Sequence, residues 1–481
     1  MGAGLSILPL ALVLVLIVTR RVTLAAAGVV ALVATIPSLV QLRGADGLAS
    51  FVWLESLKGA WVAWQGLSVI LAGVLLYQVM HRRPAARPEA APGIDPHRAA
   101  FAACFLFGTF VESAVGFGVG TIIAAVGLMR LGLTGAAAAA LSVFSQILVP
   151  WGAMAVGTGI GAGLLGVDLI AMGTRTAEVT ALTVPLLLPF FWLLLRRTGV
   201  ALHWRNMALD ALLILALGGL LVAVNRWVAV ELGGILAPGV LAVAVTVPRL
   251  ARDPASAGAL LRDVWPYLLL AVSLLATRLV PGLPELLHAV LDLRPFADMP
   301  AFPVLYHASF WLLVTALVAA PRSVWHGAYL SVLRDSLNMA RTPLLVTLFF
   351  VVQAQWMLES GGAAALGAAW QALAGRLAVL AAPLFSAAIA GPSGSNTAAI
   401  AMMMPVMAPI AVATGVPVLV VVAAQNIAGG LSTMLSPGRV ALAAGLLGCQ
   451  GSEGAVYRAM LPVTAAILLA PIAVLAILAF G

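Results

Sequence analysis

Two short polar segments interrupt the long apolar runs of this chain: Phe110-Val-Glu-Ser-Ala-Val-Gly-Phe-Gly-Val-Gly120 and Gly391-Pro-Ser-Gly-Ser-Asn-Thr-Ala-Ala399. Both lie inside stretches that are apolar enough to enter a bilayer. A broken backbone survives at that depth only where it is buried in protein or lines a watery cavity, because lipid cannot hydrogen-bond the freed groups. The segments therefore predict two hairpin tips around a solute site. The tip residues are Ser113, Gly116, Gly118, Gly391 and Gly394.

Composition places the chain among membrane proteins. Of its 481 residues, 63% are hydrophobic and 9% are charged, and the mean hydropathy is +1.11, which excludes a soluble globule of ordinary composition. The net charge of +8 does not indicate a nucleic-acid partner, because the basic residues are spread over the gaps between apolar runs. The two cysteines fit neither a disulfide framework nor a metal site, and we expect no metal or other cofactor.

Hydropathy predicts an all-α, multi-pass membrane protein with about twelve transmembrane helices, since a span needs about 20 apolar residues. The predicted spans are residues 4–19, 22–42, 61–80, 134–156, 177–195, 206–224, 228–247, 264–281, 303–320, 343–358, 416–448 and 456–480. Two further apolar segments, 98–130 and 376–414, carry the polar interruptions. We expect both to be re-entrant hairpins. A pair of spans in place of either hairpin would leave the sidedness of the chain unchanged, so this alternative stays open.

The basic residues agree with that topology. With the N-terminus outside, seventeen Lys and Arg residues face the cytoplasm, seven face outward, and one, Arg439, lies within a span. This bias satisfies the positive-inside rule. The sequence therefore predicts a multi-pass protein whose N-terminus lies outside.

The same topology predicts an inverted repeat. Residues 1–197 hold three spans, the first hairpin and two more spans; residues 206–248 form a connecting helix pair; residues 264–481 repeat the first pattern in the opposite orientation. Gly116 to Gln146 is 146 − 116 = 30 residues, and Asn396 to Asn426 is 426 − 396 = 30 residues. Inverted repeats with discontinuous helices at the midplane are a recurring transporter plan.

Each hairpin is followed by a span that also carries a break. The first contains Ser145-Gln146 and Pro150-Trp151-Gly152, and the second contains Gln425-Asn426, Gly429-Gly430 and Ser436-Pro437-Gly438. Proline and paired glycines free backbone groups from the helix ladder, so we expect helix ends to converge near the midplane. Helix N-termini attract anions. The candidate binding residues are Gln146, Ser393, Ser395, Asn396, Thr397, Gln425, Asn426, Ser436 and Arg439.

The alternative for the second tip is a purely structural role, in which its serine, asparagine and threonine side chains only cap the helix predicted at 398–414. The matching broken span and the inverted partner favour a binding role over capping alone.

These segments resemble the L-lactate permease family of bacterial lactate and glycolate transporters. The resemblance rests on Phe110 to Gly118, on Asn396, on Asn426 with Gly429-Gly430, and on Met434-Leu-Ser-Pro437 and Gly451-Ser-Glu-Gly-Ala-Val-Tyr-Arg458. It implies proton symport of a 2-hydroxymonocarboxylate (L-lactate, D-lactate or glycolate) across the bacterial inner membrane. The matching motif positions are Glu112, Ser395, Asn396, Asn426 and Ser436. Two positions depart from the family pattern: members tend to carry an acidic residue where this chain has Pro392, and a small polar residue where it has Arg439.

Two charged residues are candidates for transport chemistry. Arg439 lies inside a predicted span, where a guanidinium is costly and usually paired or functional, and it could bind a carboxylate with two parallel hydrogen bonds. Its alternatives are snorkelling to the cytoplasmic side and a salt bridge with Glu453. Glu112 is the candidate proton carrier, because burial favours the neutral carboxyl; its alternative is a structural glutamate that ties the hairpin tip. Glu359 and His307 are weaker candidates for the proton.

Three classes of function compete. We expect an elevator-like secondary transporter for a small monocarboxylate, coupled to protons, with sodium as the alternative coupling ion. An intramembrane enzyme would need a nucleophile with a base or a metal cluster, and the six histidines show no such spacing. A channel would need rings of carbonyls or charges. The sequence leaves a homodimer open.

Overall fold

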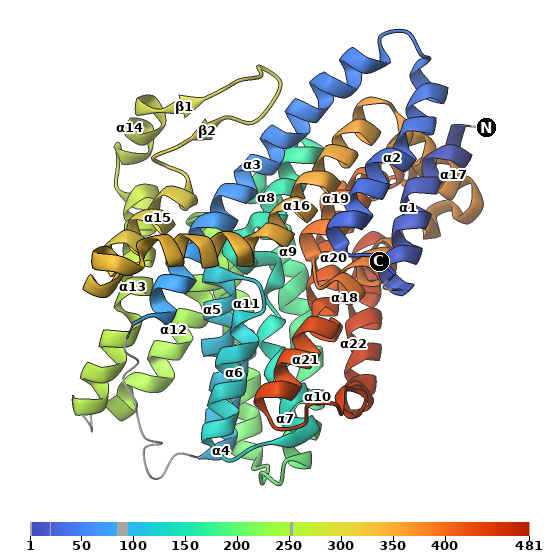
Figure 1. The fold of residues 1–481 in the computed structure, drawn as a ribbon. Coiled ribbons are helices and arrows are strands. Elements are labelled where there is room, and N and C mark those ends of the chain that lie inside the picture. The colour runs from blue at the N-terminus through green and yellow to red at the C-terminus, as the bar shows by residue number, and fades with distance from the viewer. Residues whose placement is uncertain (1, 20, 84–94, 251–253, 481) are drawn as a thin grey trace.

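The computed structural model describes residues 2–19, 21–83, 95–250 and 254–480, which form one helical assembly (Figure 1). By length and hydropathy, eleven of the described helices can cross a membrane, or up to thirteen if each of two bent pairs counts as one span. This confirms the predicted helical, polytopic class. The described residues depart from it only in two short antiparallel strands, β1 (Asp292–Leu293) and β2 (Phe302–Pro303).

Three helices form a wall that we call the scaffold: α2 (Leu24–Arg43), α3 (Leu48–His81) and α16 (Tyr329–Glu359). Figure 1 shows α3 as a long blue helix that crosses the molecule diagonally with α16 beside it. The two run antiparallel, because Gln355 donates to Glu55 at 2.9 Å and Arg82 pairs with Asp335 at 2.7 Å. Helix α1 (Gly2–Thr19) packs on α2, and α15 (Ala308–Ala319) packs on α3.

The first hairpin rises through α4 (Pro96–Phe101), the π-helical turn η1 (Ala102–Phe107) and α5 (Gly108–Val115), and returns through α6 (Val119–Arg130). The reversal lies at Gly116–Gly118, where all three residues have positive φ, including Phe117 at 62°. Helix α6 has 12 residues, about 18 Å, which is too short to cross a bilayer. It packs back along η1 and α4, so the segment is a hairpin whose two ends lie together.

The second hairpin consists of the 3₁₀ turn η6 (Gly375–Leu380), α18 (Ala381–Ser393) and α19 (Asn396–Thr414). Its tip is Gly394-Ser395, with Gly394 left-handed at φ 69°. Helix α18 packs against α19 along the hairpin. The preceding helix α17 (Gly362–Ala374) was not predicted from the sequence.

Both predicted breaks in the following spans are present. In the first half, α7 (Gly135–Ser142), the 3₁₀ turns η2 (Val143–Gln146) and η3 (Val149–Trp151), and α8 (Gly152–Leu165) form a pair bent by 50°. In the second, α20 (Val418–Ser432) and η7 (Thr433–Leu435) end at the extended residue Ser436, and α21 (Pro437–Leu446) follows. Residues 420–432 are all buried, so the protein core surrounds α20.

The remaining helices complete the two halves and the connecting pair. They are α9 (Leu169–Thr183), the turn η4 (Val184–Leu187), α10 (Leu188–Arg197), α11 (Trp204–Trp227), α12 (Val230–Leu250), α13 (Pro254–Leu279), α14 (Leu283–Val290), the turn η5 (Val324–Ala328) and α22 (Glu453–Phe480). The division into two halves around a connecting helix pair and the inverted repeat both stay predictions.

Several predicted boundaries were wrong. The span predicted at 343–358 begins at Tyr329, the one at 61–80 begins at Leu48, and the one at 303–320 is only α15. The predicted spans stopped at charged residues that extend the helices, such as Asp335, which pairs with Arg82 while its side chain stays 46% exposed. Helix α13 also continues through a 95° bend into α14.

A buried polar cluster fastens the base of the first hairpin to the connecting pair. Asp210 of α11 accepts from His97 at 2.7 Å and from Trp192 at 2.8 Å, and the His97 and Asp210 side chains are almost fully buried. Trp151 donates to Asn225 of α11 at 3.0 Å. The connecting pair therefore belongs to the same packed body as the first hairpin.

Replacing Asp210 with alanine is expected to lower the apparent melting temperature in detergent. The change leaves two buried N–H groups without an acceptor, at about 1–3 kcal/mol for each. Asp46→Ala is the matched control, because Asp46 is exposed. A wild-type melting temperature for the Asp210 variant would contradict the proposed fastening.

Candidate functional site

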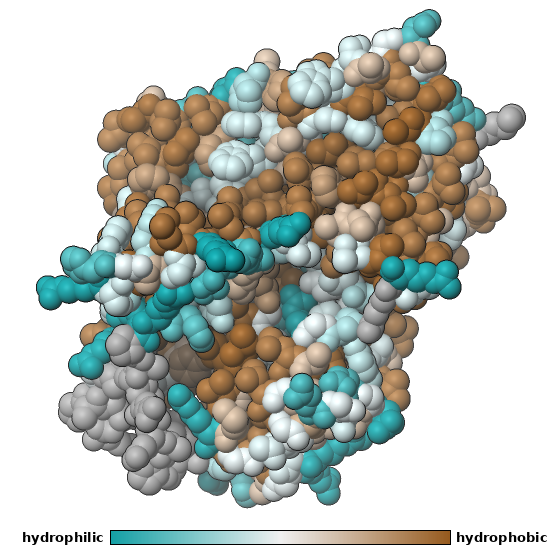
Figure 2. Space-filling view, viewed as in Figure 1, coloured by the Kyte–Doolittle hydropathy of each residue, from teal (hydrophilic) through white to brown (hydrophobic). Residues whose placement is uncertain are grey.

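A cavity of about 530 Å³ lies where the two hairpin tips and the two broken spans meet the scaffold. Figure 2 shows the molecule hollowed on this face, between α16 above and α6 and α21 below. Nine predicted site residues line the cavity: Glu112, Gly116, Ser393, Gly394, Ser395, Asn396, Thr397, Ser436 and Arg439. Among the described residues that line it, only Glu112 and Arg439 are charged.

Glu112 ties the first hairpin tip to itself. Its carboxylate accepts the backbone N–H of Gly118 at 3.1 Å and that of Gly120 at 2.9 Å. These are the first free N–H groups of α6, so the carboxylate occupies the anion position that a helix N-terminus provides. Gly120 has no room for a side chain, since an added Cβ would lie 2.4 Å from the Gly108 carbonyl oxygen. Glu112 therefore has the structural role of tying the hairpin tip, which the sequence left as the alternative to proton transfer.

Arg439 connects the two tips. One terminal nitrogen donates to the Gly394 carbonyl at 3.0 Å and to the Thr433 carbonyl at 3.3 Å. The other lies 3.7 Å from the Glu112 carboxylate. The predicted alternatives of snorkelling and of pairing with Glu453 were wrong, because Glu453 accepts from the Gly451 N–H instead. The Nε atom of Arg439 is buried without a partner among the described residues.

The second tip divides its polar residues between capping and the cavity. Ser395 caps α19 by accepting from Ala398 at 3.2 Å, and Ser393 accepts the Ser395 N–H at 3.1 Å. Asn396 instead donates to Asn426 at 2.8 Å. The capping alternative therefore holds for the two serines and not for Asn396.

A chain of hydrogen bonds continues from Asn426 into the first half of the protein. Asn426 donates to Thr158 of α8 at 2.9 Å, and Thr158 donates to the Pro150 carbonyl at 2.7 Å. The two broken spans are thereby joined across 268 residues of sequence.

Six predicted site residues lie outside the cavity: Gln146, Gln425, Asn426, Ser113, Gly118 and Gly391. Gln146 donates to Thr121 at 3.1 Å, which joins the first hairpin to its broken span as Asn396 and Asn426 do in the second half. Gln425 is fully buried, and neither end of its amide has a partner in the described part of the chain. Asn426 acts on the site through Asn396.

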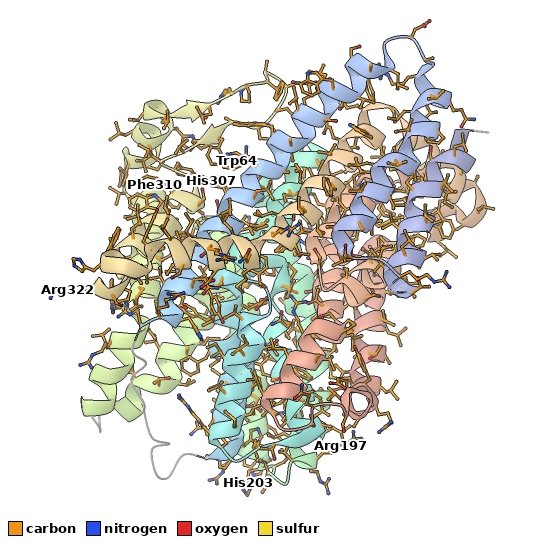
Figure 3. The ribbon with its side chains drawn as sticks, viewed as in Figure 1. Trp64, Arg197, His203, His307, Phe310 and Arg322 are labelled. Carbon is orange, nitrogen blue, oxygen red and sulfur yellow. The ribbon has the colours of Figure 1, made fainter. Side chains whose placement is uncertain are left out.

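The two weaker proton candidates also lie elsewhere. Glu359 is exposed at the end of α16. His307 caps α15 and packs on Phe302 with ring centroids 4.5 Å apart, and Figure 3 shows it near Trp64 and Phe310.

Sequence reasoning missed the scaffold wall and one strained turn. The wall consists of Leu24, Ile70, Thr342, Pro343, Val346 and Thr347; these residues belong to ordinary apolar helices and carry no distinguishing signal. The turn is Ala153–Ala155, three consecutive left-handed residues in α8. Each costs roughly 1–2 kcal/mol, and such strain is concentrated at functional sites. Proline at 150 and glycine at 152 indicated a break there but not its handedness.

Comparison with known proteins identifies the family. A family model described as L-lactate permease matches residues 3–252 and 273–480. The chain belongs to the L-lactate permease family. It is therefore a multi-pass membrane transporter of small organic anions and not an enzyme, as the sequence motifs implied.

Two solved structures are also similar to this permease family member. The Alcanivorax borkumensis YdaH transporter is 18% identical with a TM-score of 0.44, over 91% of this chain and 89% of that one. Neisseria gonorrhoeae MtrF, described with a class of antimetabolite efflux pumps, is 16% identical with a TM-score of 0.43, over 92% and 86%. A comparison with curated proteins found no match.

Replacing Asn396 with aspartate is expected to abolish binding of an organic anion while leaving membrane insertion intact. The new carboxylate would repel the anion inside the cavity. Binding is measured by isothermal titration of the purified protein, and the control is Thr414→Val at the far end of α19. Unchanged affinity in the Asn396 variant would show that the site lies elsewhere.

Proposed function

We propose that this transporter moves a 2-hydroxymonocarboxylate, L-lactate with D-lactate or glycolate as relatives, together with one proton across the bacterial inner membrane. The observation that supports it is Arg439, which lines the cavity and whose guanidinium contacts Glu112. A single fixed cation suits a ligand with a single carboxylate, since guanidinium and carboxylate form strong charge-assisted hydrogen bonds.

The rest of the cavity suits a small hydroxy acid. The N-terminal ends of α19 and α21 face the cavity through Ser395 and Ser436 and add partial positive charge. The Thr397 and Ser436 side chains also line the cavity and have hydroxyls that can pair with the 2-hydroxyl group. A substrate of this class would place its carboxylate toward Arg439 and its hydroxyl toward these side chains.

Charge balance favours a proton as the coupling ion. Ionised Glu112 and Arg439 together carry no net charge, and an arriving monocarboxylate would add one negative charge at membrane depth. A proton on Glu112 removes that excess and releases Arg439 for the substrate. The loaded site is then neutral and avoids about 2.3 kcal/mol of work per charge and 100 mV of membrane potential.

Sodium is the rival coupling ion. Its support is a pair of buried oxygens, Asn396 Oδ1 and Ser386 Oγ, that have no partner among the described residues and lie against Gly429. The described residues contain no group of three or more His, Cys, Asp or Glu side chains that could hold a metal. Two neutral oxygens are a weak site for a cation, so the Glu112 and Arg439 pair favours the proton.

We also propose an elevator-like movement of the hairpin body past the scaffold. Helix α3 meets this body through Gly66, next to Val156, and Gly73, next to the Val115 backbone. No hydrogen bond joins α2, α3 or α16 to α5, α8 or α19 in the described residues, so the surface can slide. Figure 3 places Arg322 at mid-height and Arg197 and His203 at the lower end. The predicted topology places all three residues on the cytoplasmic side. Their different heights therefore support a displacement of the scaffold relative to the hairpin body.

Replacing Glu112 with glutamine is expected to separate exchange from accumulation. The amide keeps the size of the side chain but cannot carry a proton through the cycle. In liposomes, the variant should exchange labelled for unlabelled L-lactate and should fail to accumulate it under an imposed pH gradient. Wild-type protein with a sodium gradient alone is the control for the rival ion. Accumulation by the variant at the wild-type level would show that another group carries the proton.

A disulfide between scaffold and hairpin body is expected to stop transport reversibly. An added Cβ at Gly73 would lie 4.0 Å from Val115 Cα, so the two positions are close neighbours, and Gly73→Cys with Val115→Cys is the pair to cross-link after Cys104 and Cys449 are replaced by alanine. The control pair is Gly391→Cys with Ser432→Cys, whose Cβ atoms would lie 3.9 Å apart within the hairpin body. Oxidation should block uptake only in the first pair, and reduction should restore it. Full activity of the oxidised first pair would exclude the sliding movement.

A further inference from the structure

Thr158 makes an unusual hydrogen bond for a helical threonine. Other buried threonines, Thr176, Thr180 and Thr183, donate to the carbonyl four residues earlier in their own helix. The Thr158 hydroxyl donates instead to Pro150, eight residues earlier. The left-handed turn at Ala153–Ala155 explains this difference, because it reverses the helix for one turn and brings the Pro150 carbonyl to the Thr158 side chain. The strained turn thus places the Pro150 carbonyl within hydrogen-bond distance of the Thr158 hydroxyl.

Donor and acceptor chemistry then fixes the direction of each hydrogen bond from Thr158 through Asn426 to Asn396. A hydroxyl has one proton, and Thr158 uses it on Pro150, so its oxygen can only accept from Asn426. Asn426 must therefore point its NH₂ group toward Thr158 and its oxygen toward Asn396. Asn396 must in turn point its NH₂ group toward Asn426. Its own oxygen is directed at Gly429, which does not line the cavity.

We infer that Thr158 is a positioning residue that makes Asn396 present an N–H group, and not an oxygen, to the substrate carboxylate. The inference rests on the proposed function, because it needs an anion beside Asn396. An amide nitrogen has two hydrogens; one is bonded to Asn426, and the other has no partner among the described residues. If both amides were turned over, Asn396 would present its oxygen to the anion and repel it.

Thr158→Val tests the inference, because valine has nearly the same shape and no hydroxyl. Asn426 loses its acceptor, both amides can turn over, and KM for L-lactate is expected to rise about tenfold or more, as for loss of a hydrogen bond to a charged group; kcat should change much less. Thr158→Ser keeps the hydroxyl and should restore KM. Thr176→Val is the matched control, since its hydroxyl bonds only its own helix.

A double mutant distinguishes positioning from a general structural effect. In an Asn396→Ala background there is no amide to orient, so adding Thr158→Val should leave KM unchanged. A further tenfold rise in that background, or a wild-type KM in Thr158→Val alone, would overturn the inference.

Melting temperatures give a readout that needs no substrate. Thr158 and Asn396 do not bond each other directly. The hydrogen bonds through Asn426 nevertheless predict that the changes in apparent melting temperature caused by Thr158→Val and Asn396→Ala are not additive. Additive shifts would overturn the inference even if the protein carries another anion. Absence of L-lactate uptake by the wild-type protein, with non-additive melting, would instead refute the proposed substrate and keep the role of Thr158.

Discussion

The buried guanidinium of Arg439 is the constraint on which the site depends. A cation at membrane depth persists only where its hydrogen bonds and its charge are met, and no continuous helix can meet them because its carbonyls are used within the helix. The two breaks supply what is missing: Gly394 and Thr433 offer carbonyls, and Glu112 offers the counter-charge. The first hairpin needs its reversal at Gly116–Gly118 to bring Glu112 there. The backbone breaks and the buried charge therefore depend on each other.

The strained turn in α8 shows how the cost of a break is offset. Three left-handed residues without glycine cost several kcal/mol by the usual measure of about 1–2 kcal/mol each. In return, the turn leaves the Pro150 carbonyl bonded to Thr158 and lets Asn426 join the two halves. It also packs beneath the first hairpin tip, where a Cβ on Gly116 would lie 3.0 Å from Ala153 Cβ. A regular helix would lose the amide chain and push the tip away.

The sequence predicted the hairpins and the broken spans because glycine, proline and polar residues inside apolar runs have one physical explanation at membrane depth. It predicted nine of the residues that line the cavity for the same reason. It did not predict that Arg439 pairs with Glu112, since the two are far apart in sequence and Glu453 is nearer. It also missed the first half of α16, because charged residues such as Asp335, which is partly exposed and pairs with Arg82, lower the mean hydropathy of that segment. The scaffold side of the cavity was beyond reach, since residues such as Ile70 and Val346 look like any lipid-facing or core position.

The contacts between the halves explain how a change at one hairpin can reach the other. Arg439 touches the tip of the second hairpin through the Gly394 carbonyl and the first through Glu112. In the proposed proton symport, a proton on Glu112 would therefore change the forces on both tips through the single side chain of Arg439. Coupling between distant sites needs a physical element with two arrangements, and in the proposed mechanism the Arg439 guanidinium, facing either Glu112 or a substrate carboxylate, would be that element. The hydrogen-bonded amides from Asn396 to Thr158 also join the two halves, so the halves are linked directly by side-chain contacts and not only through the scaffold.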